Sequence, residues 1–483
     1  EKKTEEVVQK MISAASAENP AKQLEKGTFV LAFDVLANTP RGALSALALL
    51  AAQWKHFDES VLEDQVGKLM GKLAGHGMAR EAGTLVELAS KANLTFDDAA
   101  LVNYVEVQTT SYDAMSAYRA FKFVQQLRDG SVPFECYSKT IQSLSIQTLS
   151  KVRGAGAVEW DLITTALSGV CNGSLSATTE QVRQLVEYLT STMAKQGRNQ
   201  EAVKILTLIE RSVSDVDSSN LDYLTTCSFN NVMAGWMDYD ASKKASAQFS
   251  HLKKHHEAGI SHLKPDRVSY ALVLRALSKR KDSANKAEDI LGELLRLYDE
   301  FGTEDLKPDD GHFKSALIAL KEEAPPDLVD RSMAMLTQMK KAGIVTEHFI
   351  FNFVMNSILT SSDQNKVARV MEVRQLMKEE GVKPNEVTHS MTLNACSTAC
   401  PDDIEWALEL ALESITEARK SRVDLQVYAS LVNALRHLLK DDTRRREKVA
   451  SAAMRACRKD GFLNSKMMGQ FQSLMHNGQN DSR

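Results

Sequence analysis

The side chains that could support catalysis or bind a metal are scattered along this chain of 483 residues. Cys396 and Cys400 are four residues apart and could share one face of a helix. No histidine or second cysteine pair lies near them to complete the four ligands of a structural zinc site. The pairs Asp402-Asp403 and Asp441-Asp442 stand beside expected turns, where carboxylates usually cap helices, and His255-His256 is typical of a polar surface. We therefore predict no catalytic site, no metal site and no cofactor, and hence a protein that is not an enzyme.

Composition and charge narrow the class of protein further. Glycine (23) and proline (9) are scarce, which favours a helical protein. The six cysteines form no C-x-x-C pair, which favours reduced thiols. The strongest apolar segment, residues 44–54, is too short to span a bilayer, so we expect no membrane insertion. A net charge of −4 argues against a protein that coats nucleic acid non-specifically. Local basic clusters remain at Lys243-Lys244, Lys253-Lys254, Lys279-Arg280-Lys281 and Arg444-Arg445-Arg446.

A short motif, Lys-Pro-Asp or Lys-Pro-Asn, recurs in the second half of the chain, ending at Asp266, Asp309 and Asn385. Residues 348–385 show one whole period of the pattern. Apolar residues at helical spacing predict a first helix over residues 349–360, and a second set predicts a second helix over 366–380. Gly381 and Pro384 then supply the expected helix stop. The period is therefore a helical hairpin, and repetition of hairpins predicts an all-α fold.

Six repeats can be aligned by one ring in the first helix, namely Phe229, Tyr270, Phe313, Phe351, His389 and Tyr428. The predicted starts of these repeats are Thr226, Arg267, Asp310, His348, Glu386 and Leu425. Hairpins with weaker signatures extend the pattern back to about residue 28. We divide the chain into a lead-in helix (1–27), degenerate repeats (28–149), an irregular part with a hinge and one hairpin (150–220), six repeats (221–464), and a capping helix with a tail (465–483).

A helical hairpin that ends in Gly-[Ile/Val]-x-Pro-[Asp/Asn] and is followed by Val-[Ser/Thr] and a ring resembles the pentatricopeptide repeat family. The repeats here are longer than is usual in that family. The resemblance implies a right-handed superhelical solenoid of antiparallel hairpins whose first helices line a concave surface. It also implies that each repeat faces one nucleotide of single-stranded RNA, with its fifth and last residues at the base edge and an apolar second residue against the base plane.

Three repeats carry side chains that match the base-reading positions of this family. The resemblance implies a uracil-preferring pair at Asn230 and Asp266, a pyrimidine pair at Asn352 and Asn385, and a guanine pair at Ser390 and Asp424. The alternative for all of these residues is a helix cap or a structural hydrogen bond, because Asn, Asp and Ser favour such positions. Other residues at these positions match no base-reading pair (Ala271, Asp309, Lys314, Glu347, Ala429), while Ser138 is a polar fifth residue in the front half.

The resemblance predicts a non-enzymatic protein that binds single-stranded RNA in a mitochondrial or plastid ribonucleoprotein, such as a ribosome or a machinery of RNA processing or translation. Ribosomal or other complex proteins are then possible partners. The chain starts at Glu1 instead of a methionine, which agrees with a removed transit peptide. The alternative is a scaffold that binds proteins with little or no RNA contact, and a third hypothesis is an accessory subunit of a nuclease or polymerase complex. A positive concave groove would favour RNA, and a neutral or apolar groove would favour protein.

Overall fold

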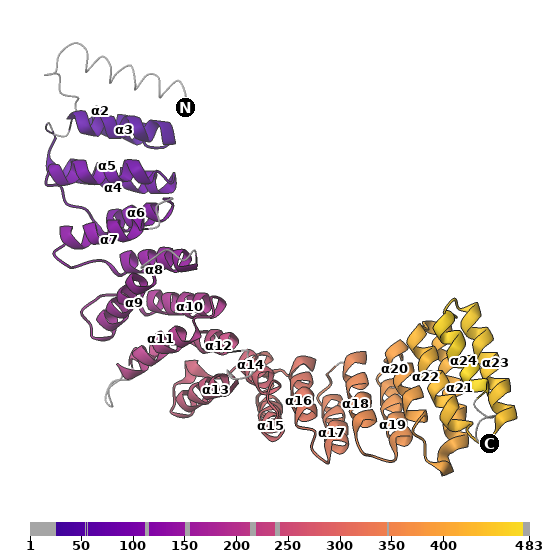
Figure 1. Cartoon of the computed structure of the whole chain (residues 1–483). Helices are drawn as coiled ribbons and strands as arrows, with labels where there is room; N and C mark the ends of the chain where they lie inside the picture. The colour runs from indigo at the N-terminus through magenta and orange to yellow at the C-terminus, as the bar shows by residue number, and fades with distance from the viewer. Residues whose placement is uncertain are drawn as a thin grey trace. The chain divides into compact units, whose positions relative to one another are not determined.

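The computed structural model describes residues 26–476, apart from 54, 56, 112–114, 150–154, 213–218, 237–241 and 345–346. In this part of the chain the regular structure is helical, with no strand (Figure 1). The predicted all-α fold of antiparallel helical hairpins is therefore confirmed. The predicted lead-in helix lies almost wholly outside the described residues, and so does the tail after His476.

The chain forms two compact units. The first ends at Gly235 and also takes His255–Leu263, while the second consists of Trp236–Lys254 and the chain from Lys264 onward. The helices up to Gly235 are α2 Lys26–Leu36, α3 Pro40–Gln53, α4 Glu59–Gly75, α5 Ala79–Lys91, α6 Asp98–Thr109, α7 Ser116–Leu127, α8 Phe134–Leu149, α9 Ala155–Cys171, α10 Thr179–Lys195, α11 Asn199–Arg211 and α12 Thr226–Gly235. Helix α13, Ser242–Glu257, contributes to both units.

The second unit continues the hairpins to the end of the described chain. Its helices are α14 Arg267–Leu277, α15 Ala284–Phe301, α16 Asp310–Glu323, α17 Leu328–Lys341, α18 His348–Thr360, α19 Lys366–Glu379, α20 Glu386–Cys396, α21 Ile404–Ser421, α22 Leu425–Leu438, α23 Thr443–Lys459 and α24 Ser465–His476. The six predicted repeat starts coincide with the first residues of α12, α14, α16, α18, α20 and α22. First helices therefore carry even numbers and second helices odd numbers.

The stretch 150–180, which the sequence marks as irregular, contains a regular helix. Helix α9 packs against α8 as the second member of a hairpin. Buried Glu159 on α9 accepts a hydrogen bond from Ser145 on α8 (2.6 Å) and pairs with Arg198 in the turn after α10 (2.8 Å). A buried carboxylate is tolerated only when it is paired and hydrogen-bonded, as it is here. Gly156 and Gly169 therefore lie within a regular helix and do not interrupt the hairpin.

The joints between repeats form as the motif predicts. Gly381 adopts a left-handed conformation (φ 70°), and the Val382 N–H reaches back to the Met377 carbonyl (2.9 Å), which closes the end of α19. At the start of the next helix, the Asn385 side chain accepts from the Thr388 N–H (3.0 Å). Asp266, Asp309 and Asp424 cap α14, α16 and α22 in the same way. Each cap contributes about 1 kcal/mol to the free energy of unfolding.

The ring used to align the repeats is the fourth residue of every first helix, and it is buried in all six. The residues at this position are Phe229, Tyr270, Phe313, Phe351, His389 and Tyr428. Where the ring is polar, it also bonds toward its second helix. Tyr270 donates to Glu293 (3.0 Å), Tyr428 donates to Asp460 (2.5 Å), and His389 Nδ1 lies 3.1 Å from Ser414 Oγ. The fourth residue therefore fixes how each first helix is rotated against its partner.

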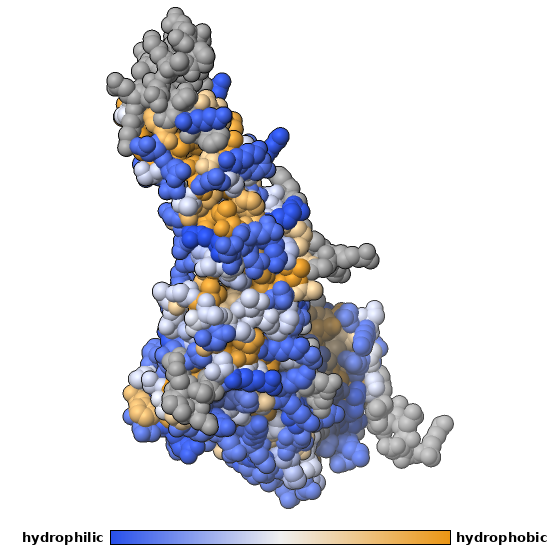
Figure 2. Space-filling model, turned by 90° about the vertical axis from the view of Figure 1, so that its left-hand side faces the viewer, coloured by the Kyte–Doolittle hydropathy of each residue, from blue (hydrophilic) through white to orange (hydrophobic). Residues whose placement is uncertain are grey.

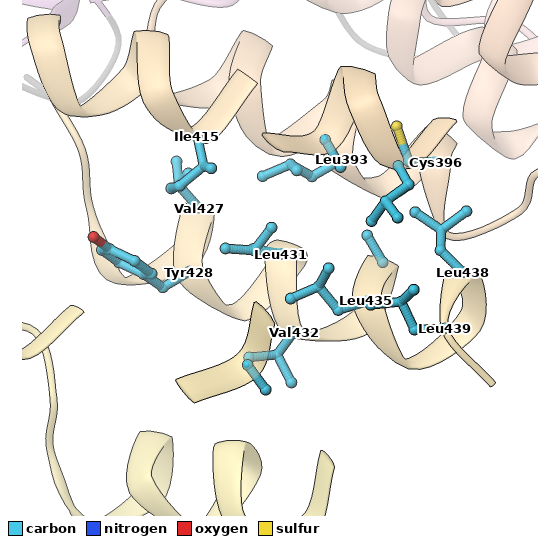
Figure 3. Close-up of a cluster of buried hydrophobic side chains, with 14 of the residues drawn as sticks. Leu393, Cys396, Ile415, Val427, Tyr428, Leu431, Val432, Leu435, Leu438 and Leu439 are labelled. Atoms are coloured by element: carbon cyan, nitrogen blue, oxygen red, sulfur yellow. The ribbon is translucent and has the colours of Figure 1, made fainter. Parts of the chain in front are cut away.

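Aliphatic side chains fill the space around these rings. Figure 3 shows this at the C-terminal end, where Leu431 and Leu435 of α22 lie among Leu393 and Cys396 of α20 and Ile415 of α21. Tyr428 stands at the edge of the cluster. Each fully buried leucine contributes on the order of 2 kcal/mol by removal of apolar surface from water. The core thus runs from one hairpin into the next.

Ion pairs join successive second helices of the second unit. Each pair connects residues about one repeat apart, which the sequence analysis did not foresee. The pairs are Lys253–Glu293, Arg331–Glu288, Arg369–Asp330, Lys340–Glu379, Arg374–Glu417 and Arg445–Glu405, at 2.5 to 2.8 Å. A single exposed pair contributes about 0 to 1 kcal/mol. Repeated along the helices, however, the pairs favour one register of stacking over its neighbours.

No described helix is both long enough and apolar enough to cross a bilayer. On the face that Figure 2 presents, apolar residues occur as separate patches between polar ones. Exposed large apolar side chains are otherwise dispersed, as is normal for a folded surface.

The buried imidazole of His389 generates a prediction about pH. Burial lowers its pKa from the ordinary value of 6.5, and the Arg374 guanidinium lowers it further against the opposing carboxylate of Glu417. The unfolded chain therefore binds this proton at a higher pH than the folded chain. The contribution to stability is fully present above pH 6.5 and is lost as the pH falls below it, until the folded pKa is reached. We expect H389F/S414A to unfold with a weaker pH dependence than the wild type across this range in urea titrations.

The double substitution is chosen because phenylalanine already occupies this position at Phe229, Phe313 and Phe351. Removing the Ser414 hydroxyl avoids leaving a buried donor without a partner. S414A alone is the control and should keep the wild-type pH dependence. An unchanged pH dependence in the double variant would show that other groups dominate the titration.

Candidate nucleic-acid interface

The fifth residue of each first helix follows the buried ring and is turned about 100° away from it around the helix axis. It therefore lies beside the neighbouring first helix. First helices of the second unit pack against one another in this way, with α14 on α16, α18 on α20 and α20 on α22. The side chains at these positions are thus held between consecutive repeats, where they can meet the capping residue of the next repeat.

Asn352 and Asn385, one of the three predicted pairs, are in direct contact. The Asn352 Nδ2 group donates to Asn385 Oδ1 (3.2 Å), and Thr388 Oγ1 lies 2.8 Å from Asn352 Oδ1 and 2.9 Å from Asn385 Oδ1. We call these three residues the amide cluster. It connects α18 with the first turn of α20. Asn352 and Thr388 are buried, and Asn385 is half-buried.

The hydrogen bonds of the amide cluster fix which way both amides face. The Asn385 oxygen already accepts from the Thr388 N–H, and the Asn352 oxygen faces the Thr388 hydroxyl. Both oxygens are therefore turned toward Thr388. Each Asn side chain has two N–H donors. One donor of Asn352 is used within the cluster, so the remaining Asn352 donor and the Asn385 NH₂ group are what the cluster presents to a ligand.

An open pocket of about 500 Å³ borders the amide cluster. Two apolar side chains, Phe349 and Val387, flank it, and each is 46% exposed although it is large and apolar. They are the second residues of consecutive repeats. Aromatic and aliphatic side chains placed in this way can hold the plane of a nucleobase. The other residues that line the pocket are Glu347, His348, Asn352, Phe353, Asn356, Asn385 and Met391.

Two lysines of α16 lie over aromatic rings of α18 beside this pocket. Lys314 Nζ is 4.1 Å from the centre of the Phe349 ring, and Lys321 Nζ is 5.2 Å from the centre of the Phe353 ring. A cation over a ring face is attracted by the ring quadrupole. The lysines therefore bring positive charge to the pocket, and neither forms an ion pair with a described residue. Lys314 is the fifth residue of its repeat and matches no base-reading pair. The sequence did not predict its contact with the Phe349 ring.

Ser390 and Asp424 are not brought together as Asn352 and Asn385 are. The Ser390 hydroxyl bonds with Ser430 on α22 (2.7 Å), and both are buried. Asp424 caps α22 by accepting from the Val427 N–H (2.8 Å). Among the described contacts, no hydrogen bond joins the two side chains. Their geometry agrees with the structural alternative, in which both serve to hold the helices.

Asn230 belongs to the first compact unit and Asp266 to the second. Asn230 lies on α12 and is 8% exposed. Asp266 caps α14, where it accepts from the Ser269 N–H and from the Ser269 hydroxyl, both at 2.8 Å. In the front half, Ser138 on α8 is half-buried and accepts from Gln142 Nε2 (3.4 Å).

Thr388 is a functional candidate that the sequence analysis missed. The Val-[Ser/Thr] element after each joint contains it, so the signal was present. What could not be foreseen is that its hydroxyl reaches the side chain of Asn352, which lies 36 residues earlier. Thr388 thus both supports the cap and orients the fifth residue of the preceding repeat.

None of the cysteines lines the pocket beside the amide cluster. All six are free thiols, and burial raises the pKa of Cys396 to about 12. A protonated thiol is a poor metal ligand, since metal binding requires the thiolate. No cluster of His, Cys, Asp or Glu suited to a metal ion occurs among the described residues.

Residues 335–398, which include the amide cluster, match the family described as "Pentatricopeptide repeat domain". The repeat family predicted from the Lys-Pro joints is thereby confirmed for this part of the chain. A chloroplastic pentatricopeptide repeat-containing protein of Arabidopsis thaliana is 33% identical over 111 residues, which are 21% of this chain and 13% of the relative. The chain thus spans only a small part of the length of this relative.

Two solved structures of low similarity were also found. The maize pentatricopeptide repeat protein PPR10 is 16% identical and covers 96% of this chain and 62% of its own, with a TM-score of 0.41. Yeast Rmd9p in complex with a 16-nt target RNA is 11% identical and covers 92% of this chain and 93% of its own, with a TM-score of 0.34.

The double role of Asn385 generates a second prediction. Asn385→Ala removes the cap of α20 and the acceptor of Asn352, so we expect the free energy of unfolding to fall by about 1 to 2 kcal/mol. Asn385→Asp keeps both acceptor functions and should remain within about 0.5 kcal/mol of the wild type. Urea titrations followed by circular dichroism measure both values. Equal losses in the two variants would contradict the assigned cap.

Proposed function

We propose, from the pentatricopeptide repeats in residues 335–398, that this chain binds single-stranded RNA and has no enzymatic activity of its own. The observation that carries the proposal is the pocket beside the amide cluster. There, amide donors face an open space between two exposed apolar side chains, Phe349 and Val387. Single-stranded RNA offers unstacked bases that such a site can hold by their planes and their edges.

A pyrimidine fits the donors of the amide cluster. Cytosine presents two neighbouring acceptors, N3 and O2, on its Watson–Crick edge, and these suit the NH₂ group of Asn385 and the remaining donor of Asn352. Uracil presents an N3–H donor at the same place, which would face another donor. The cluster therefore favours cytosine over uracil. Thr388 would preserve this preference, because its hydroxyl holds the Asn352 oxygen and its backbone N–H holds the Asn385 oxygen.

Two lysines of α16 place positive charge next to the pocket, which supports RNA binding there. Lys314 and Lys321 lie beside the pocket, although the chain as a whole has a net charge of −4. Binding through a few lysines releases few counterions, so its dependence on salt should be shallow. Shallow dependence distinguishes such a site from a protein that coats RNA through charge alone.

An organelle is the proposed location, in a mitochondrial or plastid ribonucleoprotein. The support is the chloroplastic relative from Arabidopsis thaliana and the family to which residues 335–398 belong. Ribosomal or other complex proteins are proposed as partners that complete the affinity. The reason is that Ser390 is bonded to Ser430 and the fifth residues Ala271 and Ala429 have no polar group for a base.

A scaffold that binds proteins is the second candidate function. It is favoured by the same fifth residues, since Ser390 is bonded within the chain and Ala271 and Ala429 are apolar. Crosslinking in the native extract separates the two functions. RNA joined to peptides that contain Asn352 or Asn385 would support RNA binding. Crosslinks to proteins alone, together with no binding of short RNA by the purified chain, would overturn it.

A change at Asn385 tests the base preference. Asn385→Asp replaces an NH₂ donor by an oxygen acceptor, which suits the N3–H of uracil and opposes N3 of cytosine. We expect the ratio of affinities for oligo(C) and oligo(U) to move toward oligo(U) by about tenfold, since one hydrogen bond contributes about 1 kcal/mol and an unpaired partner costs more. Fluorescence anisotropy with labelled oligonucleotides measures the ratio.

Asp424→Asn is the matched control for this experiment, because it exchanges the same two side chains at a cap that contacts no fifth residue. It should leave the ratio unchanged. A shift of similar size in the opposite direction in Asp424→Asn would mean that net charge, and not the amide cluster, sets the preference, because the two substitutions change the net charge by one unit in opposite directions.

A further inference from the structure

Asparagine recurs at the ninth residue of three consecutive first helices. Asn356 lies on α18, Asn394 on α20 and Asn433 on α22, at intervals of 38 and 39 residues. The amide side chain is absent from the ninth position of the preceding repeats, which carry Arg275 and Ile318. We call Asn356, Asn394 and Asn433 the asparagine row.

The asparagine row lies one helical turn beyond the fifth residues. Asn356 is four residues after Asn352, and Asn394 is four residues after Ser390. Residues four apart share one face of an α-helix, about one turn of 5.4 Å along the axis. Asn356 lines the same pocket as Asn352 and Asn385. A ligand held by the amide cluster therefore extends toward the row.

The amides of the row have unused capacity for hydrogen bonds. In the described part of the chain, the side chains of Asn356 and Asn394 are half-buried and form no hydrogen bond. Asn433 is exposed and only accepts one bond from Arg436 (3.3 Å). The fifth-position residues Asn352 and Ser390, in contrast, are already bonded within the chain. Among the described residues, the amides of Asn356 and Asn394 therefore have no hydrogen-bond partner, and Asn433 uses only its oxygen.

We infer that the asparagine row binds the ribose 2′-hydroxyl groups of the RNA. A 2′-hydroxyl both donates and accepts a hydrogen bond, and an Asn amide offers both functions in one group. A phosphate accepts only and would be matched by a cation, as at Arg275 in the earlier repeat. The ribose lies about one base width from the Watson–Crick edge, which is comparable to the helical turn that separates the row from the fifth residues. This inference rests on the proposed RNA binding and adds selectivity for RNA over DNA.

The test compares oligo(C) with oligo(dC) of equal length, which differ in the 2′-hydroxyl groups. The triple variant N356A/N394A/N433A should bind oligo(C) about tenfold more weakly, because two or three hydrogen bonds of somewhat less than about 1 kcal/mol each are lost. Its affinity for oligo(dC) should stay unchanged. The wild-type preference for RNA over DNA would then largely disappear. Circular dichroism checks that the variant is folded.

Asn365→Ala is the control, because Asn365 is an exposed asparagine in the turn before α19, away from the first-helix surface. It should bind both oligonucleotides as the wild type does. Equal weakening for oligo(C) and oligo(dC) in the triple variant would overturn the 2′-hydroxyl assignment, and so would no change for either. If the wild type binds neither oligonucleotide, the proposed function fails first and this inference falls with it. Loss of RNA binding in Asn352→Ala without loss in the triple variant would overturn the inference alone.

Discussion

The packing of one buried ring against the second helix in each repeat governs the rest of this structure. An α-helix that contacts its partner mainly through aliphatic side chains can rotate by a few tens of degrees at small cost. A large ring at the fourth residue removes that freedom, and Tyr270, His389 and Tyr428 strengthen the constraint with a hydrogen bond to the second-helix side. Once the ring is fixed, helical geometry fixes the direction of the second, fifth and ninth residues. The packing of the core therefore determines which side chains face a ligand.

The capping residues connect stability with recognition. A capping carboxylate or amide satisfies a backbone N–H that would otherwise be left without a partner at the start of the helix. At Asn385, however, capping uses only the oxygen and leaves the NH₂ group for another purpose. An Asn at this position can therefore be selected for what it presents to a ligand without a loss of helix stability, and an Asp can be exchanged for it at little cost to the fold. This separation explains how a repeat protein can vary its binding residues while its hairpins stay intact.

The opposite side of the repeats uses a different kind of interaction. Many charged side chains of the second unit form ion pairs between successive second helices, such as Arg331 with Glu288 and Arg369 with Asp330. Charges paired in this way contribute little to a field that would attract RNA over long distances. The lysines at Phe349 and Phe353 differ because they lie over aromatic rings. The near-neutral net charge of the chain is therefore compatible with local binding of RNA.

The sequence by itself determined the repeat boundaries and the buried ring. The Lys-Pro joints act through local backbone geometry at three of the repeat starts, and the aligned rings gave the other three, so all six first helices begin where the sequence predicts. The contacts between repeats depend on how helices that are more than thirty residues apart pack, and local sequence does not encode those distances. Only the tertiary structure decided that Asn352 contacts Asn385 and Thr388 and that the Ser390 hydroxyl is hydrogen-bonded to Ser430. It also decided that α9 is a regular helix despite its glycines. Each of these outcomes depends on separations of a few ångströms between side chains on different helices, which are set when the hairpins stack.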